Sequence, residues 1–218
     1  MNDSICCSLA TTPEERNQVY RMRYACYRRD EAIEARADES FSDSYDDMPN
    51  HFSFLARAGQ AEPLGTVRIS VVRPEPAWET APSHKVFGDN PEFQRIAGGT
   101  FVEASRLCFG VQARRDALMR VIAYLAALAD FYQAEWLVAC PRVEHSQTYE
   151  RLFGFVRIAE PRQYLGVKFK TTLLAVPRAK LIEYTSGTNS RATKTMDAAR
   201  LEAFAHIAAA SPLSVGHL

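Results

Sequence analysis

Two opposite charges lie inside a segment that otherwise has the composition of a buried β-strand. Residues 100–107 carry Glu103 and Arg106 among apolar and small side chains. An unpaired charge is costly to bury, so a strand that enters the core should not hold two of them without a reason. A basic stretch with Arg114 and Arg115 follows, and then a long apolar helix begins. This order predicts a site where an amine meets an activated acyl group.

Glu103 is the candidate general base for such a reaction. Acyl transfer to an amine requires a deprotonated amine, a polarised thioester carbonyl and a proton for the departing thiolate. A carboxyl group among apolar residues has a raised pKa, which suits it to accept a proton directly or through a water molecule. The alternative role is a structural ion pair with Arg68 or Arg106. In a regular strand Glu103 and Arg106 face opposite sides, unless a bulge re-aims one of them.

Four charged residues earlier in the chain are candidates for the same site. Arg68 can pair with Asp43 or Asp46 and so order an acidic loop, or it can bind a substrate carboxylate. Without such a partner the two aspartates belong to a solvated loop. Arg23 lies on a helix among apolar neighbours, so it joins this cluster or forms a surface salt bridge. Arg106 is likewise a candidate to bind a substrate carboxylate or to anchor the acidic loop, and the alternative is a structural role.

The elements that must position these residues follow from turn signals and periodicity. A capping box at Thr12 and Glu15, with Pro13 at the first helical position, predicts a helix that runs to about residue 29. Gly154 predicts the end of a later helix. We expect strands at 52–57, 65–72, 100–109 and 136–140, a final strand or pair of strands over 164–176, and helices at about 116–132 and 144–152.

Two segments between these elements are expected to be irregular. Residues 30–50 read as an acidic loop, either solvated or acting as a lid over a site. Residues 73–98 hold several prolines and glycines and read as a long loop with one helical turn. The order of elements predicts a mixed α/β domain over residues 1–178. A C-terminal extension, 179–218, is expected to hold a polar linker and an alanine-rich helix.

Composition excludes several classes of protein. The 218 residues have a formal net charge of zero, which argues against a general nucleic-acid binder. The N-terminal residues lack the pattern of a signal peptide, and the longest apolar run is too short to span a bilayer, so we expect a cytoplasmic protein without a transmembrane segment. The histidines and the five cysteines show no metal-ligand spacing, so no metal site is expected.

Motifs in both halves resemble known acyltransferases. The run Tyr149-Glu-Arg-Leu-Phe-Gly154-Phe155, after a strand, resembles the late strand–helix segment of the GNAT acyltransferase superfamily. The earlier motifs together resemble acyl-homoserine lactone synthases and, more closely, N-acyl amino acid synthases. These motifs are Val19-Tyr-Arg-Met-Arg23, Asp43-Ser-Tyr-Asp46, Gly65-Thr-Val-Arg68 and Glu103-Ala-Ser-Arg106.

The resemblance implies a GNAT-like fold, with a central, mostly antiparallel sheet flanked by helices. It also implies transfer of a medium- or long-chain acyl group from an acyl carrier protein to the amine of an amino acid. No tightly bound cofactor is implied; the donor substrate is acyl-phosphopantetheine or acyl-coenzyme A. Residues 112–117 lack the glycines of the usual pyrophosphate loop, which favours the carrier protein over coenzyme A.

Further site residues come from the same resemblance. Tyr149 occupies the position from which many GNAT enzymes protonate the thiolate; its alternative is an aromatic packing role. Arg114, Arg115 and Arg120 either bind the pantetheine phosphate or the acidic face of a carrier protein, or form a solvated surface. Four apolar residues line an acyl tunnel or belong to the core: Phe101, Leu107, Phe109 and Leu125.

Two alternative functions stay open. One is an acyl-homoserine lactone synthase that uses S-adenosylmethionine. Lactone synthases often have a tryptophan after the first helix, and this chain has none there. It also has Arg68-Ile-Ser-Val-Val-Arg-Pro where lactone synthases have Arg-Leu-x-Pro-Thr. The other alternative is a non-catalytic protein that binds an acyl carrier and has lost turnover.

Overall fold

The computed structural model describes residues 5–59, 61–113 and 115–186. Within them, seven strands form one sheet in the order β1-β2-β3-β4-β5-β7-β6. Neighbouring strands are antiparallel, except that β4 runs parallel to β5. The strands are β1 (Ile5–Leu9), β2 (His51–Ala58), β3 (Gly65–Val72), β4 (Phe101–Phe109), β5 (Trp136–Ala139), β6 (Val156–Gln163) and β7 (Lys170–Pro177).

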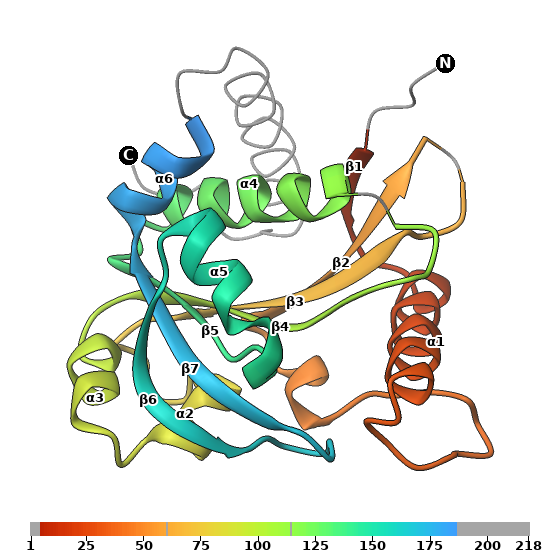
Figure 1. Cartoon of the computed structure of the whole chain (residues 1–218), viewed down its shortest axis with the longest axis horizontal. Coiled ribbons are helices and arrows are strands. Elements are labelled where there is room, and N and C mark those ends of the chain that lie inside the picture. The colour runs from red at the N-terminus through yellow and green to blue at the C-terminus, as the bar shows by residue number, and fades with distance from the viewer. Residues whose placement is uncertain (1–4, 60, 114, 187–218) are drawn as a thin grey trace.

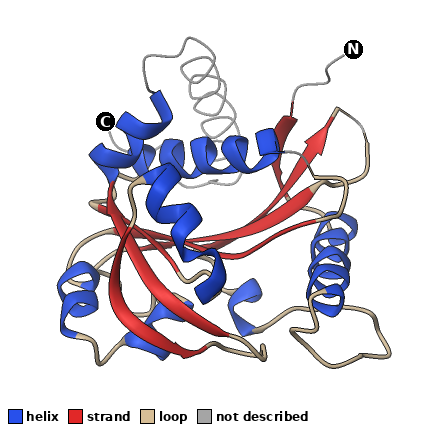
Figure 2. Ribbon diagram, viewed as in Figure 1, coloured by secondary structure: helices blue, strands red, loops and turns tan. Residues whose placement is uncertain are grey.

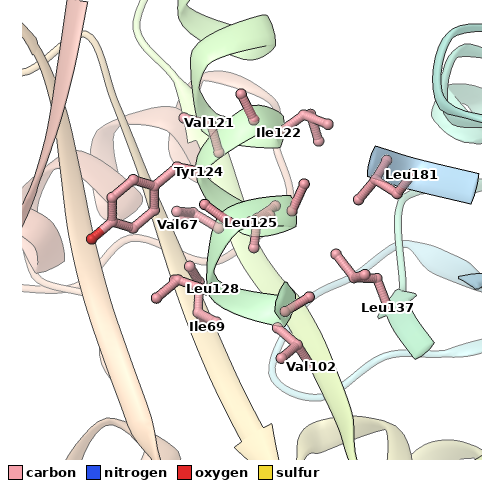
Figure 3. Packing of buried hydrophobic residues seen from close by; sticks show 14 of the residues in the cluster. Val67, Ile69, Val102, Val121, Ile122, Tyr124, Leu125, Leu128, Leu137 and Leu181 are labelled. Carbon is pink, nitrogen blue, oxygen red and sulfur yellow. The ribbon is translucent and has the colours of Figure 1, made fainter. Parts of the chain in front are cut away.

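Helices cover both faces of this sheet (Figures 1 and 2). The longest apolar helix, α4, packs Val121, Leu125 and Leu128 against one face, which Val67 and Val102 also line (Figure 3). Residues from α1, α2 and α3 form a second core on the other face. The helical segments are α1 (Pro13–Arg29), η1 (Ser44–Asp47), α2 (Pro82–Phe87), α3 (Pro91–Ala97), α4 (Arg115–Phe131), η2 (Val143–His145), α5 (Ser146–Phe153) and α6 (Arg178–Ser186).

The main predicted elements are confirmed, and so are two of their end signals. Thr12 and Glu15 form the expected capping box at the start of α1. Gly154 adopts a left-handed conformation, with φ of 68°, at the end of α5. No helix in the described part of the chain is long and apolar enough to cross a membrane. The predicted linker and alanine-rich helix lie outside the described residues, which end with α6 at Ser186.

Three expectations from the sequence were wrong. Residues 73–98 are not a loop with one turn: they hold α2 and α3, and each of these helices begins at a proline. Proline suits a first helical position because its missing N–H would have no partner there, so the same residue can signal a loop or a helix start. Residues 164–169 connect β6 to β7 instead of beginning a strand. Strands β1 and β6, which pair with β2 and β7, were not predicted at all.

The sheet opens between β4 and β5. These strands pair from Phe101 with Trp136 to Ala104 with Ala139, and β5 then ends. The remaining residues of β4 continue to Phe109 without a partner on that side. The gap between the two strands is therefore where the fold leaves room for a ligand.

The face of β3 that points away from α4 is polar and yet fully buried. Thr66, Arg68 and Ser70 alternate with apolar residues, and all three side chains are inaccessible to solvent. Buried polar side chains need partners, so their enclosure requires a polar layer above them. Segment η1 and the end of α1 supply part of that layer.

Candidate active site

A β-bulge in β4 positions Arg106. Thr66 of β3 pairs with Cys108 and Arg68 pairs with Ser105, so β4 has one more residue than β3 between these pairs. Arg106 takes up the extra length with a positive φ of 55°. This left-handed conformation costs a non-glycine residue about 1–2 kcal/mol. Of the two arrangements expected for Glu103 and Arg106, opposite faces or a bulge, the structure has the bulge, which turns Arg106 toward the polar layer.

Arg106 is held there by three hydrogen bonds and two aromatic rings. Its Nη2 and Nε donate to Asp43 Oδ2 at 2.6 and 3.1 Å, and Nη2 also donates to the carbonyl of Leu165 at 3.0 Å. The guanidinium carbon lies 4.9 Å from the ring centre of Phe41 and 5.6 Å from that of Tyr164. These contacts offset the cost of the strained backbone.

Three arginines and two aspartates form one buried network, which we call the arginine–aspartate cluster. Asp43 also accepts from Arg68 Nη1 at 2.5 Å. Asp46 accepts from Arg23 Nη1 at 2.8 and 2.9 Å, and it lies 3.2 Å from Arg68 Nη1. A chain of direct contacts therefore links the sequence-predicted residues Arg23, Asp46, Arg68, Asp43 and Arg106.

The aspartates come from an ordered turn and not from a solvated loop. Asp43 caps η1 by accepting from the Tyr45 N–H at 3.0 Å, and its own N–H donates to Asp46 Oδ2 at 3.0 Å. Burial by itself would raise the pKa of Asp43. The guanidinium groups of Arg68 and Arg106 outweigh it and hold that pKa well below its usual range. The carboxylate is thus ionised and fixed in place.

Glu103 lies on the same face of the sheet but outside this network. Its side chain is fully buried, and within the described residues it makes no ion pair. Its Oε2 accepts from the Ser83 backbone N–H at 3.1 Å, and its Oε1 accepts from the Tyr164 hydroxyl at 3.4 Å. Burial raises the pKa of Glu103. The proposed ion pair with Arg68 or Arg106 is not formed, whereas the raised pKa agrees with the sequence-based expectation.

A cleft of about 370 Å³ lies where β4 and β5 diverge. Four residues named from the sequence line it: Arg106, Leu107, Phe109 and Tyr149. Its other lining includes three further groups of residues. These are Tyr27, Arg29 and Asp30 from the end of α1, Cys140, Pro141, Arg142 and His145 after β5, and Tyr164 and Phe169 from the β6–β7 connection.

The mouth of the cleft is charged. Arg29 and Asp30 on one side and Arg142 and His145 on the other also line an adjoining hollow of about 430 Å³, which Glu31 and Glu144 complete. Arg142 Nη1 lies 3.9 Å from Asp30 Oδ2, and Arg29 Nη1 donates to the carbonyl of Phe109 at 3.2 Å. This rim connects α1 to both diverging strands.

Several predicted site residues do not line the cleft. Phe101 and Leu125 are core residues on opposite faces of the sheet, and neither lines the cleft. Arg120 is 7% exposed on α4 and is not among the lining residues. Arg114 lies outside the described residues, as does the side chain of Arg115.

Tyr149 lies in the cleft wall. Its ring packs edge-on against Phe153 and Phe155, with centroid distances of 6.3 and 5.8 Å. Burial raises the pKa of Tyr149 to about 12. The phenol is therefore protonated at neutral pH, and its packing role and its place in the cleft coexist.

Sequence reasoning missed Tyr164, Ser83 and Ser105. Ser105 accepts from Arg68 Nε at 3.1 Å, and Ser83 and Tyr164 hold Glu103. One available signal was the alternation of polar and apolar residues in β3. Its polar side chains all face one side, which indicates that further polar partners must lie there. Nothing in the local sequence marks Tyr164, which reaches the site only through the β6–β7 connection.

A family model covers the part of the chain that forms this site. The model of the N-acyl amino acid synthase FeeM matches residues 18–177, more than half of the chain. This range contains every member of the arginine–aspartate cluster, Glu103 and the cleft. No curated protein matches the chain.

Solved structures share the fold at low sequence identity, which confirms the GNAT-like acyltransferase architecture. FeeM, an N-acyl amino acid synthase from uncultured soil microbes, has a TM-score of 0.67 and 15% identity over 88% of this chain and 98% of its own. The acyl-homoserine lactone synthase LasI has a TM-score of 0.61 and 14% identity over 84% and 94%. BjaI, a coenzyme A-dependent acyl-homoserine lactone synthase solved with SAM and isopentyl-CoA, has a TM-score of 0.57 and 19% identity. The match covers 88% of this chain and 98% of BjaI. The chain belongs to the FeeM family of N-acyl amino acid synthases and is an acyltransferase.

Proposed function

We propose that this protein transfers a medium- or long-chain fatty acyl group from an acyl carrier protein to the amine of an amino acid. The observation that carries the proposal is the cleft between β4 and β5. Its charged rim carries Arg29 and Arg142, its wall has apolar side chains, and Arg106 and Tyr164 also line it, with the Tyr164 hydroxyl donating to Glu103. A thioester on a flexible arm and a small charged amine can meet in such a space.

Two arginines on the rim support an acidic carrier as the donor; the same hollow is also lined by Asp30, Glu31 and Glu144. Arg29 and Arg142 lie at the mouth, where a phosphopantetheine phosphate would remain while its thioester enters. We propose that Arg114 and Arg115 add to this contact, because they follow Phe109 of the cleft wall closely in sequence. Arg120 is buried away from the cleft and has no place in this contact. Complementary charge speeds association with an acidic partner.

The chemistry requires one group to accept a proton and one to release it. We assign the first role to Glu103, whose raised pKa suits a general base, and the second to Tyr149, which lies in the cleft wall as a neutral phenol. Arg106 is the cluster member that lines the cleft, so it is the candidate to hold the carboxylate of the acceptor. Leu107 and Phe109 offer apolar contacts to the acyl chain.

The experiment incubates the purified protein with acyl carrier protein that bears acyl chains of several lengths and with a panel of amino acids. Mass spectrometry then detects N-acyl amino acids. Acyl-coenzyme A replaces the carrier protein in a parallel series, and S-adenosylmethionine replaces the amino acids in another. N-acyl amino acid formed from the carrier protein supports the proposal. Absence of such a product with every amino acid overturns it, and product from S-adenosylmethionine alone establishes a lactone synthase instead.

The base assignment has its own test in Glu103→Gln. The amide keeps the size of the side chain but cannot accept the amine proton. We expect kcat/KM to fall by about 10²- to 10⁴-fold, the usual contribution of a general base. Glu92→Gln, on the surface of α3 and paired there with Arg95, serves as the matched control and should leave kcat/KM unchanged. Wild-type activity in Glu103→Gln would remove Glu103 from the mechanism.

A further inference from the structure

Glu103 and the cleft do not meet directly. The side chain of Glu103 is fully buried and is not part of the cleft wall. Oε2 faces the backbone N–H of Ser83, in the first turn of α2. Oε1 faces the hydroxyl of Tyr164, and Tyr164 does line the cleft. A proton that travels from the cleft to Glu103 therefore has the Tyr164 hydroxyl on its path.

Tyr164 is held firmly in this position. It lies directly after β6, and it is 6% exposed. The guanidinium of Arg106 lies over its ring, and the same guanidinium donates to the carbonyl of the next residue, Leu165. The strained bulge that aims Arg106 therefore also fixes the ring whose hydroxyl points at Glu103.

The charge state of Tyr164 suits a proton carrier. Burial, followed by the negative charge of Glu103, raises the pKa of Tyr164 well above its ordinary value, so the phenol is neutral. A neutral phenol has one proton to donate and lone pairs to accept another. The oxygen–oxygen distance of 3.4 Å exceeds the usual distance of about 2.7–2.8 Å, and catalytic hydrogen bonds are often long until substrate is bound.

The other tyrosines of the cleft wall provide a comparison. Tyr27 lies against Arg106, and Tyr149 packs against phenylalanines. Within the described residues, Tyr164 is the cleft tyrosine whose hydroxyl donates to a carboxylate. The Tyr164 side chain therefore lies between the buried carboxylate of Glu103 and the cleft that the amine must enter. A purely structural role would not require this position.

We propose that Tyr164 relays a proton from the acceptor amine in the cleft to Glu103. The proposal rests on the function proposed above and assigns its proton path. As the amine nitrogen forms its bond to the thioester carbon, an N–H proton passes to the Tyr164 oxygen. The phenol's own proton passes to Oε1 of Glu103, so the phenol ends neutral and the carboxylate becomes a carboxylic acid. The carbon–sulfur bond then breaks, and the thiolate takes a proton from Tyr149.

The test compares Tyr164→Phe with Glu103→Gln and with the double variant. Tyr164→Phe keeps the ring against Arg106 and removes the hydroxyl alone. Two groups that act in series lose their function together, so we expect each single variant to lower kcat by about 10²- to 10⁴-fold, with little further loss in the double variant. The limb of the kcat–pH profile that belongs to the base should disappear in both. Tyr184→Phe, half-exposed on α6, is the control and should retain wild-type kcat.

Other results overturn the relay. Tyr164→Phe with kcat within about threefold of wild type excludes it, and so do independent losses that multiply in the double variant. A folded Tyr164→Phe that raises KM but keeps both kcat and its pH profile shows that the residue only shapes the cleft. If the wild-type protein forms no N-acyl product, the proposed function fails and the relay with it; an active wild type with an active Tyr164→Phe rejects the relay alone.

A second variant keeps the hydroxyl and changes its acidity. Replacement of Tyr164 by 3-fluorotyrosine preserves the size of the ring and lowers the proton affinity of the phenol. A relay predicts a shift in the pH dependence of kcat with the fluorinated residue, whereas a hydroxyl that only holds Glu103 in place predicts none. An unchanged profile in a fully folded fluorinated protein therefore argues against proton transfer through Tyr164.

Discussion

The arginine–aspartate cluster and Glu103 show two ways of burying charge on one face of the same sheet. Asp43 and Asp46 each receive hydrogen bonds from buried guanidinium groups at 2.5 to 3.1 Å. Glu103 receives one backbone N–H and one phenol at 3.1 and 3.4 Å, and no guanidinium. Asp43 and Glu103 consequently respond in opposite directions, because the pKa of Asp43 falls and that of Glu103 rises.

This difference in pKa distinguishes the aspartates, which suit a structural scaffold, from Glu103, which suits a reactive group. A carboxylate between arginines is permanently ionised, so it can hold η1 and the bulge of β4 in place, but it cannot take up a proton near neutral pH. A buried carboxyl group without an ion-pair partner has a raised pKa, so it takes up a proton more readily than an ordinary carboxylate does. The cluster therefore fits a positioning role, and Glu103 fits a role in proton transfer.

The largest expected effect is on the scaffold side, in Asp43→Asn. This change leaves Arg68 and Arg106 buried beside a neutral amide, and breaking a buried ion pair in this way costs about 3–5 kcal/mol. Urea unfolding at neutral pH measures the free energy of unfolding. Since the pKa of Asp43 is lowered in the folded state, its stabilisation is present at neutral pH and is lost as pH falls below the ordinary carboxyl range. The variant should therefore be less stable than wild type chiefly above that range.

Asp47→Asn provides the control for this measurement. Asp47 belongs to the same turn but is exposed to solvent, and surface substitutions change stability by about 0.5 kcal/mol or less. If Asp43→Asn and Asp47→Asn have equal stability at neutral pH, the cluster is not a scaffold and the comparison with Glu103 fails.

A smaller effect is expected for Arg106→Lys. Lysine keeps the charge but cannot reach Asp43 and the Leu165 carbonyl with the planar arrangement of a guanidinium. Loss of hydrogen bonds to a charged group should lower the free energy of unfolding by about 1.5–3 kcal/mol. Arg95→Lys, on an exposed helix face, is the control. Stability equal to wild type in Arg106→Lys would mean that charge alone, without guanidinium geometry, maintains the bulge.

The sequence predicted the members of the cluster better than the path to Glu103. Arg23, Asp43, Asp46, Arg68 and Arg106 were identified because charged residues stood in apolar or turn contexts, and each such residue demands a partner. Their mutual contacts confirm the grouping. A bulge was one of two arrangements expected from the spacing, because in a regular strand Arg106 would lie on the face opposite Glu103.

Partners that arrive through tertiary structure could not be predicted. Tyr164 and Ser83 reach Glu103 from a strand connection and a short helix that are separated from β4 in sequence. Helices α2 and α3 were read as loop, because proline marks both loops and first helical turns. Leu125 was a candidate for the acyl pocket but belongs to the core. Helical periodicity identifies an apolar face, but it does not say whether that face covers a core or a cavity.

The smallest expected effect tests the other half of the comparison, through the pH dependence of stability in Glu103→Gln. A pKa raised in the folded state means that the unfolded chain loses the Glu103 proton first as pH rises. Wild-type stability therefore declines from the ordinary carboxyl range upward, until the folded-state group also ionises. The slope from one proton cannot exceed about 1.4 kcal/mol per pH unit. Glutamine does not titrate, so the free energy of unfolding of Glu103→Gln minus that of wild type should increase from about pH 4 toward neutrality. Glu92→Gln, more than half exposed, should give a nearly flat difference. A flat difference for Glu103→Gln as well would mean that Glu103 is compensated as fully as the aspartates, which would end its distinction from the scaffold.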